Sequence, residues 1–367
     1  DEVGDVLTDT GLEVESLIDP RKRLGQLSVG EILKVEKHPN ADKLKVCDVD
    51  SGTGILKIVC GAPNVKNGMK VVVAKPGDFI PGLNINLKAS KIRDVKSEGM
   101  MCSEKELEIS DEHDGIIELP SETEVGTLFS ELVGDEKIIF EIAITPNRPD
   151  ALGIYGIARD LSASGIGKLR VSKIPNVEGI FKPHLNINLD QAVSSKECPF
   201  FVGRYLRSVQ NGESPQWLRN RLLSIGLNPI SALVDITNYL TFDRARPLHV
   251  FDADKLSGGL TVRRSVEGEK FHALDDKIYE LNEGMIVITD EKEIVSLGGI
   301  IGGMKSAVSD ETKNVLLEAA YFDPISIAAT GRKLQINSDA RYRFERGVDP
   351  SFTLSLSLIH ISEPTRR

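Results

Sequence analysis

The feature that most constrains the fold is a block of short apolar runs between residues 28 and 135, each bounded by glycine, proline or asparagine. Residues 55–59 and 71–74 are rich in β-branched side chains, which favour strands. Residues 85–89 alternate apolar and polar side chains, a pattern typical of a half-buried strand. Several short strands at this spacing predict a small closed β-barrel.

Helical patterns begin only after this block. Asp150 is placed to cap a helix that ends near Gly165, and Ser214 is placed to cap a second helix, with Pro215 in its first turn and an end at Gly226. The expected apolar faces are Ile154, Ile157, Ala158 and Leu161 in the first helix, and Leu218, Leu222 and Ile225 in the second.

The domain organisation follows from chain length and from a change in composition. The 367 residues are enough for two or three domains at about 150 residues each. Residues 173–183 are irregular and contain two prolines, so we expect a domain boundary there. Mixed strands and helices continue to about residue 350. The prediction is a multidomain α+β chain in which a β-barrel precedes an α+β domain.

The charge balance excludes a protein that coats nucleic acid by net charge alone. Lys plus Arg number 45 against 55 Asp plus Glu, a formal net charge of −10. Residues 101–135 contain one basic residue, Lys105, and eleven acidic ones, so this segment alone carries −10. Residues 28–100 carry 12 basic and eight acidic side chains, which makes the barrel the better candidate for a phosphate backbone. Phe79 is the only aromatic residue there, so a solvated surface is also compatible with the sequence.

The sequence has no apolar run near the roughly 18 residues that a membrane helix needs, so we expect no membrane partner. The chain starts without Met, and we expect a truncated start and a soluble protein.

No cysteine is part of a Cys-x-x-Cys pair or lies at metal-ligand spacing from a histidine. Buried free thiols, no metal site and a reducing cytoplasm are therefore predicted. The four cysteines are Cys47, Cys60, Cys102 and Cys198.

A glycine-rich stretch, residues 298–303, invites comparison with a phosphate-binding loop. Met304 separates Gly303 from Lys305, whereas a Walker loop needs Gly and Lys to be contiguous. The glycines also miss the G-x-G-x-x-G spacing of dinucleotide sites. We therefore predict glycines that permit close backbone approach in a sheet or pocket.

Three motifs in the barrel block, at residues 38–44, 61–65 and 97–103, resemble the oligonucleotide-fold tRNA-binding module of phenylalanyl-tRNA synthetase beta subunits. They read His-Pro-Asn-Ala-Asp-Lys-Leu, Gly-Ala-Pro-Asn-Val and Ser-Glu-Gly-Met-Met-Cys-Ser. One departure is Asp94, where the family pattern leads us to expect glycine. His38 fits either a structural turn residue or a ligand or base. The candidate tRNA-binding residues are Lys43, Lys45, Lys91 and Arg93.

The resemblance to the bacterial beta subunit continues through motifs at residues 145–152, 234–239, 247–252, 298–303, 316–320 and 343–350. It implies an oligonucleotide-binding barrel inserted in a small split α+β domain and followed by an editing domain. The expected domains are residues 1–27 with 136–178 (split N-terminal domain), 28–135 (barrel), 179–350 (editing domain) and 351–367 (a tail of doubtful origin). Residues 356–367 match neither the family nor a clear helix, and we expect a foreign or read-through tail. The chain is expected to be a fragment that lacks residues at both ends.

The editing domain of this family hydrolyses tyrosine that is wrongly esterified to phenylalanine tRNA. By resemblance, Glu318 accepts a hydrogen bond from the phenol, Gly299 leaves room for the ring and Ala340 lines the pocket. His249, Thr237 and Asn238 are the expected catalytic residues, which hold the ester and a hydrolytic water. From the residues alone, His249 between Leu248 and Val250 also fits a structural histidine, whereas a carboxylate inside the apolar run around Glu318 is unusual.

The resemblance also implies partners and cofactors. Aminoacylation belongs to the alpha subunit, with which the beta subunit forms an alpha2-beta2 heterotetramer that binds phenylalanine tRNA. Mg and ATP serve the whole enzyme, and none is expected on this chain. The alternative is a non-catalytic tRNA-binding and subunit-assembly module whose editing site is degenerate.

Overall fold

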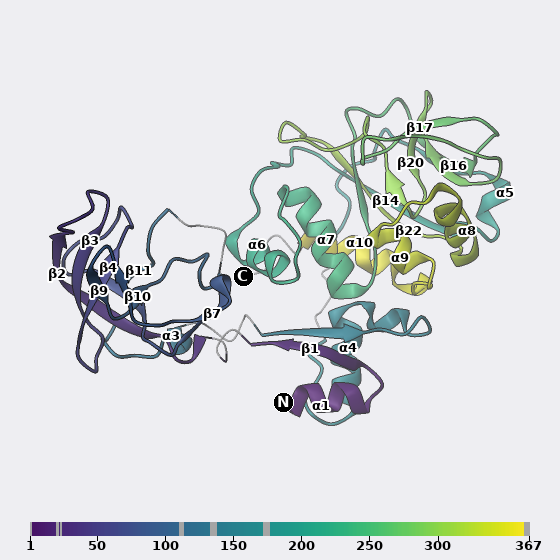
Figure 1. The fold of residues 1–367 in the computed structure, drawn as a ribbon. Helices are drawn as coiled ribbons and strands as arrows, with labels where there is room; N and C mark the ends of the chain where they lie inside the picture. The colour runs from purple at the N-terminus through teal and green to yellow at the C-terminus, as the bar shows by residue number, and fades with distance from the viewer. Residues whose placement is uncertain are drawn as a thin grey trace. The chain divides into compact units, whose positions relative to one another are not determined.

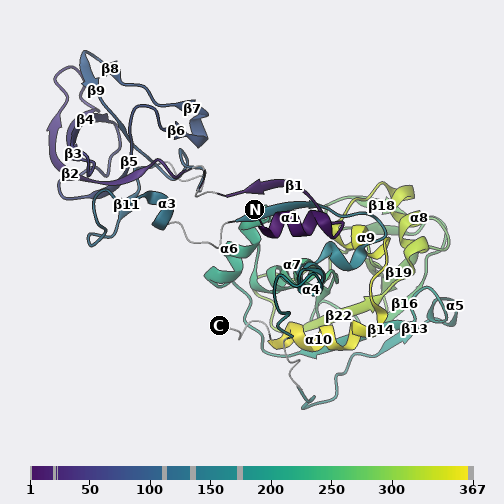
Figure 2. The same cartoon turned by 90° about the horizontal axis from the view of Figure 1, so that it is seen from below.

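The computed structural model describes residues 2–19, 22, 24–109, 114–132, 138–171 and 177–362. The chain divides into two compact units, shown as ribbons in Figures 1 and 2. Unit 1 comprises Asp1–Glu15 and Glu141–Arg367, and unit 2 comprises Ser16–Phe140, so unit 2 is inserted in the chain of unit 1. Part of the expected domain boundary, residues 172–176, lies outside the described residues.

Unit 2 is built on a six-stranded sheet with the order β10-β5-β2-β3-β4, in which β11 also pairs with β5. The strands curl into a nearly closed barrel around a core that includes Ile32, Val49 and Val71 (Figure 1). The strands expected at 55–59 and 71–74 are confirmed. The bounds are β2 Ser28–Lys37, β3 Lys45–Asp50, β4 Ile55–Cys60, β5 Lys70–Ala74, β10 Met100–Met101 and β11 Glu118–Leu119.

Two small hairpins complete unit 2. They are formed by β6 (Phe79–Ile80) with β7 (Ile85–Asn86), and by β8 (Ser90–Ile92) with β9 (Val95–Ser97). The half-buried strand expected over 85–89 is wrong, because β7 has two exposed residues and pairs only with β6. Of the expected apolar face, only Leu87 packs against a core, whereas Ile85 and Ala89 are exposed. Two short helices, η1 Pro81–Leu83 and α3 Phe129–Leu132, also belong to this unit.

Unit 1 contains a three-stranded and a five-stranded sheet that share one hydrophobic core. Phe251 and Leu316 from the first sheet pack with Val287 and Val295 from the second. The three-stranded sheet has β14 (Phe200–Leu206), β22 (Val315–Tyr321) and β15 (His249–Asp252) in that order. The five-stranded sheet has β13 Ile187–Leu189, β16 Leu260–Arg264, β19 Ile286–Thr289, β20 Ile294–Leu297 and β21 Ile301–Gly302, and a hairpin of β17 Lys270–His272 and β18 Ile278–Glu280 adjoins it.

Helices cover the other face of the three-stranded sheet. Leu233 of α7 (Ala232–Arg244) packs with Val250 and Leu317, and α6 (Gln216–Ser224) packs on α7 (Figure 2). The remaining elements are α1 Glu2–Asp9, β1 Glu13–Ile18, β12 Ile139–Ala143, η3 Pro149–Leu152, α4 Ile154–Ala163, α5 Gln191–Ser194, α8 Pro324–Leu334, α9 Asp339–Phe344, η4 Pro350–Phe352 and α10 Thr353–Ser362. β1 and β12 form a two-stranded sheet. Within the described ranges, no helix has the length and apolar character to cross a membrane.

The two helices expected after the barrel exist, but both predicted caps are wrong. Gly153 occupies the N-cap of α4, and the Asp150 carboxylate instead binds Arg148. Ser214 donates to Asp235 at 2.5 Å, which leaves Pro215 at the N-cap of α6. Of the expected apolar faces, Leu218 and Leu222 are buried, whereas Ile154 and Ile225 are exposed. The expected end of the second helix at Gly226 is confirmed by a backbone φ of +79°.

We expected no clear helix over residues 356–367, but residues 356–362 belong to α10, and residues 363–367 lie outside the described residues. Leu356 and Ile359 of this helix are buried. The expectation of no helix is therefore wrong, because an apolar residue recurs at a spacing that a helix places on one side.

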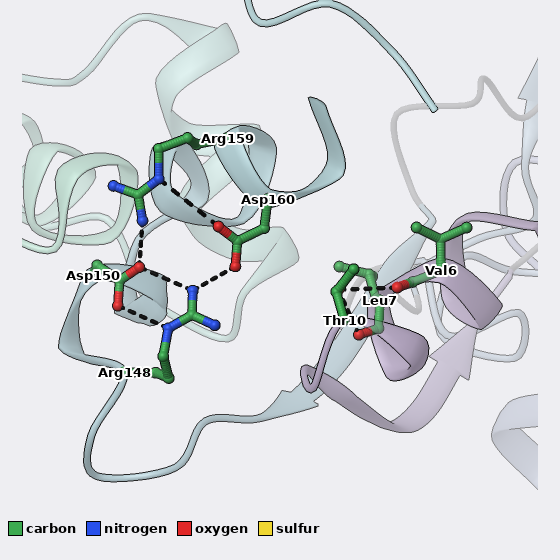
Figure 3. Close-up of polar contacts among 7 residues, drawn as sticks. All are labelled: Val6, Leu7, Thr10, Arg148, Asp150, Arg159 and Asp160. Carbon is green, nitrogen blue, oxygen red and sulfur yellow. Dashed lines mark hydrogen bonds and ion pairs between the residues drawn. The ribbon is translucent and has the colours of Figure 1, made fainter. Parts of the chain in front are cut away.

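An ion-pair network fixes the segment between β12 and α4 (Figure 3). The Arg148 guanidinium donates to both carboxylate oxygens of Asp150, at 3.0 and 2.9 Å, and also to Asp160. Arg159 binds Asp150 from α4. The Arg148 side chain, first through its hydrogen bonds, lowers the pKa of the Asp150 carboxyl. Two arginines and two aspartates thus neutralise one another and hold η3 on α4.

Replacing Asp150 by asparagine is expected to destabilise unit 1 by about 1 kcal/mol, because the bidentate charge-assisted pair is lost from a half-exposed network. The folded-state pKa of Asp150 is lowered, so its contribution is present above the unfolded pKa near 3.8 and is lost as pH falls. Thermal unfolding should therefore show a deficit at pH 7 that shrinks as the pH falls below about 3.8. Asp310→Asn, at an exposed carboxylate of the same unit, is the control; equal deficits in both variants would contradict the prediction.

Candidate functional site

The centre of the three-stranded sheet brings Glu318 and His249 together. Glu318 on β22 lies opposite His249 on β15 and opposite Gly203 on β14 in antiparallel register. Directly opposite residues in antiparallel strands project from the same face, with Cβ atoms about 5 Å apart. Glu318 and His249, predicted from the sequence to act at one site, therefore lie side by side.

Glu318 is a buried carboxyl group that lacks a matching donor. Its side chain is 6% exposed, and Oε2 has no hydrogen-bond partner within the described residues. Burial raises the pKa of Glu318 from 4.5 to about 8. At neutral pH the carboxyl is therefore mostly un-ionised, and it can both accept and donate a hydrogen bond.

His249 is also buried without a partner for Nε2, as far as the described residues extend. Burial lowers its pKa from 6.5 to about 4, so the imidazole is neutral at pH 7. Its ring packs edge-to-face on Phe251, with centroids 4.4 Å apart. A Cβ on Gly302 would lie 2.3 Å from His249 Cε1, so the glycine makes room for the ring.

Two unmatched buried polar atoms in one row require an explanation. Each costs about 1–3 kcal/mol, the desolvation penalty of a buried group without a partner. Native proteins contain few such atoms, and each is a candidate for a ligand contact. The row of Gly203, Glu318 and His249 therefore has the properties of a site that a polar ligand completes.

The glycine-rich stretch forms a β-hairpin beside this row. Leu297 pairs with Ile301 across the β20–β21 turn, so the prediction of close backbone approach in a sheet is confirmed. Gly299 has a φ of +69°, and a Cβ there would meet Phe322 and Ile327 rather than His249. The Ser338 hydroxyl donates to the Ile300 carbonyl at 2.6 Å and caps α9.

The other expected site residues lie on helices. Ala340 is in α9, next to the contact between Ser338 and Ile300, and packs against the shared core. Thr237 and Asn238 are in α7. The Thr237 hydroxyl donates to the Val234 carbonyl at 2.6 Å. Among the described contacts, no hydrogen bond links Thr237 or Asn238 to His249.

Sequence reasoning missed Gly302 and Gly203. Gly302 lies within the glycine-rich stretch, but its contact with His249 joins segments that are distant in the chain. Gly203 interrupts an aromatic-rich strand opposite Glu318, and a Cβ there would lie 2.2 Å from Ile187 Cδ1. A glycine inside an apolar strand signals close approach, and that signal was present in the sequence at residue 203.

In unit 2, three of the four candidate tRNA-binding residues are exposed. Lys43 lies in a turn, while Lys91 and Arg93 lie on the β8–β9 hairpin. Lys45 differs, because its ammonium donates to the backbone carbonyls of Pro63 and Val65, the latter at 3.1 Å. It therefore supports the barrel wall.

The structural interpretation of His38 is confirmed. Its Nδ1 accepts from the Asn40 backbone N–H at 3.0 Å, and its Nε2 lies 3.1 Å from the Ile92 carbonyl. Since Nδ1 accepts, Nε2 carries the proton and donates to Ile92. Asp94, where glycine was expected, has a φ of +73°, and the hairpin still closes through the pair of Ile92 with Val95.

All four cysteines are buried and free, as predicted. Over the part of the chain that the structure describes, no group of three or more His, Cys, Asp or Glu side chains is arranged to hold a metal ion.

Two protein-family models match this chain and identify its class. A B3/4 domain model matches residues 197–357, which contain the Glu318–His249 row, and a tRNA binding domain model matches residues 27–128. The chain is thus a multidomain α+β protein in which a tRNA-binding barrel domain is combined with a B3/4 domain.

Curated relatives then give the family. The chain is 53% identical to the phenylalanine–tRNA ligase beta subunit of Ruegeria pomeroyi, covering 96% of this chain and 45% of the relative. It is 54% identical to that of Paramagnetospirillum magneticum, with 96% and 44% coverage. The chain belongs to the family of phenylalanine–tRNA ligase beta subunits and spans less than half the length of these relatives. A solved N-terminal fragment of the beta subunit from Pyrococcus horikoshii matches 49% of this chain and 55% of its own, with 18% identity and a TM-score of 0.31.

Proposed function

We propose that the chain binds phenylalanine tRNA through unit 2 and hydrolyses tyrosine esterified to that tRNA at the Glu318–His249 row. The observation that carries the proposal is the pair of buried polar atoms, Glu318 Oε2 and His249 Nε2, that lack partners on one face of one sheet. We further propose that the chain acts in the cytoplasm with the alpha subunit of an alpha2-beta2 ligase, in which the alpha subunit uses ATP and Mg.

The proposed selectivity follows from hydrogen bonding. Tyrosine differs from phenylalanine by one hydroxyl, which a purely apolar pocket rejects only about 10²-fold. A buried carboxyl that lacks a partner reverses the preference, because phenylalanine leaves it unmatched whereas the tyrosine phenol satisfies it. We assign this role to Glu318, which accepts the phenol O–H. Gly299 and Ala340 are proposed to border the space for the ring.

Hydrolysis requires a positioned water at the ester. With a pKa of about 4, His249 is a weak base at neutral pH, so we assign it to orienting the water and the ester. Thr237 and Asn238, on α7, are proposed to hold the ester end. Lys43, Lys91 and Arg93 are the proposed phosphate contacts.

We propose the same domain bounds as those expected from the sequence. Residues 1–27 and 136–178 form a split domain, residues 28–135 the barrel and residues 179–350 the editing domain. The tRNA binding domain model matches residues 27–128, which begin one residue before the proposed barrel and end inside it. The B3/4 model matches residues 197–357, most of which lie in the proposed editing domain, and both matches support this division.

The proposal is tested by incubating the chain with phenylalanine tRNA that carries labelled tyrosine. Release of tyrosine above the spontaneous rate is the expected result. Protection of the tRNA without release supports the non-catalytic tRNA-binding and assembly module instead. Running the reaction with and without an alpha subunit shows whether the partner is needed.

Gly302→Ala is expected to lower tyrosine release at least tenfold, because the new Cβ would lie 2.3 Å from His249 Cε1 and must displace the ring. The matched control is Gly212→Ala in the same unit, where a Cβ meets nothing within 4 Å. Deacylation rates and melting temperatures of both variants are measured together. Unchanged release by Gly302→Ala would contradict the assignment of His249.

A further inference from the structure

We propose that His38 is a positioning residue that locks two basic segments of unit 2 into one phosphate-binding cluster. The inference rests on the proposed binding of tRNA by the barrel and extends it to a residue that touches no phosphate. The first segment is the turn at residues 38–44, which carries Lys43. The second is the β8–β9 hairpin, which carries Lys91 and Arg93.

Hydrogen bonds connect the two segments across a long stretch of chain. His38 Nε2 donates to the Ile92 carbonyl at 3.1 Å, and the Asn40 side-chain amide donates to the Arg93 carbonyl at 3.2 Å. His38 Nδ1 accepts from the Asn40 N–H and thereby orients both residues. His38 is 5% exposed, so its ring is enclosed between the segments that it joins.

The charges in this cluster are available, unlike most others on the barrel. Lys43, Lys91 and Arg93 are exposed and have no ion pair among the described residues. Five other lysines of the barrel each form a described ion pair: Lys34 with Glu36, Lys57 with Asp48, Lys66 with Glu118, Lys70 with Glu31 and Lys96 with Glu98. The same segments carry the exposed carboxylates Asp42 and Asp94, so the three basic side chains leave a net charge of +1 at this cluster. A phosphate backbone is attracted by this net positive charge.

The backbone of the hairpin supports a binding role for Arg93. Arg93 and Asp94 have φ values of +44° and +73°, in the left-handed region that favours glycine or asparagine. An arginine at the first of these positions strains the turn. Strained residues that persist in a fold concentrate at functional sites. The charge of Arg93 explains why arginine occupies a position that suits smaller residues.

The test measures phenylalanine tRNA binding by the full chain between 50 and 200 mM salt, with thermal melting as the folding control. His38→Ala is expected to weaken binding about tenfold and to flatten the salt dependence, because fewer phosphates are neutralised together. Lys91→Ala alone is expected to weaken binding about fivefold, but less than twofold in the His38→Ala background. Lys57→Ala, at a paired lysine, is the matched control and is expected to change binding less than twofold.

Two conservative variants separate positioning from general stability. His38→Gln keeps a donor at the Nε2 position and is expected to bind within about twofold of the original chain. His38→Asn retains only the local acceptor for Asn40 and is expected to bind as weakly as His38→Ala. Arg93→Asn is expected to raise the melting temperature by relieving the turn while it lowers tRNA affinity.

Each result decides between the alternatives. Fully additive effects of His38→Ala and Lys91→Ala, or equal binding by the Gln and Asn variants, overturn the positioning role while tRNA binding by the barrel stands. Salt-insensitive or absent tRNA binding by the original chain overturns the proposed function of the barrel and the inference together.

Discussion

Glu318→Ala is expected to abolish release of tyrosine from mischarged phenylalanine tRNA, with a loss of at least about 10²-fold in kcat/KM. The reason is that the variant removes the buried carboxyl that the phenol satisfies. His249→Ala is expected to have an effect of similar size by removing the group that orients the water. Both rates are measured with labelled tyrosine and corrected for spontaneous ester hydrolysis.

The matched control for Glu318→Ala is Glu280→Ala, which removes an exposed carboxyl of the same unit. The control should keep the rate of the original chain within a factor of two. Glu318→Gln preserves side-chain volume and distinguishes loss of chemistry from a cavity. Release at the original rate by both Glu318→Ala and His249→Ala would remove the basis for placing the editing site at this row.

The second large effect is a dependence on pH above 8. With a pKa raised to about 8 by burial, Glu318 loses its proton as the pH passes through that value. The ionised carboxylate must be hydrated before it can remain in the site, so kcat/KM should fall about tenfold per pH unit above 8. His249, with a pKa of about 4, remains neutral across the range between these values, and a plateau is expected there.

Glu318→Gln should remove the decline above pH 8, because glutamine does not ionise. The nearby titratable groups are His249 on β15 and the Cys198 thiol, whose own pKa is raised by burial and by Glu318.

The pH dependence of stability is a second measurement that reports the same proton on Glu318. Because the folded pKa is raised, the free energy of unfolding should fall as pH rises from about 4.5 to 8 and then level off, and the Gln variant should lack this trend. An enzymatic release rate in the original chain that stays constant from pH 7 through pH 9 would contradict this account.

The sequence predicted the strands best where local preference and burial agree. Ile58 of β4 and Val71 and Val73 of β5 lie in the barrel core, so propensity and packing favour the same structure there. The predicted caps failed because the same polar chemistry found stronger partners: Asp150 binds two arginines and Ser214 binds Asp235. Helix ends depend on such competition, which the local sequence does not reveal.

The candidate site was predictable in its chemistry but not in its packing. A carboxylate in the apolar run of β22 already singled out Glu318. The space for His249 depends instead on Gly302, and the lack of a free ammonium at Lys45 depends on the carbonyls of Pro63 and Val65. Both facts arise from contacts between segments that only the tertiary fold brings together.

The paired strands β1 and β12 give the insertion of unit 2 an evolutionary consequence. The chain leaves unit 1 after Glu15 and returns at Glu141, and both points lie within these two strands. For unit 1, the whole barrel therefore occupies the position of a hairpin loop. Loop-closure entropy grows only logarithmically with length, so acquiring or losing such a module changes the stability of the host fold by no more than a few kcal/mol. Gene rearrangement can insert, remove or replace the barrel without changes to the hydrophobic core that holds Glu318 and His249.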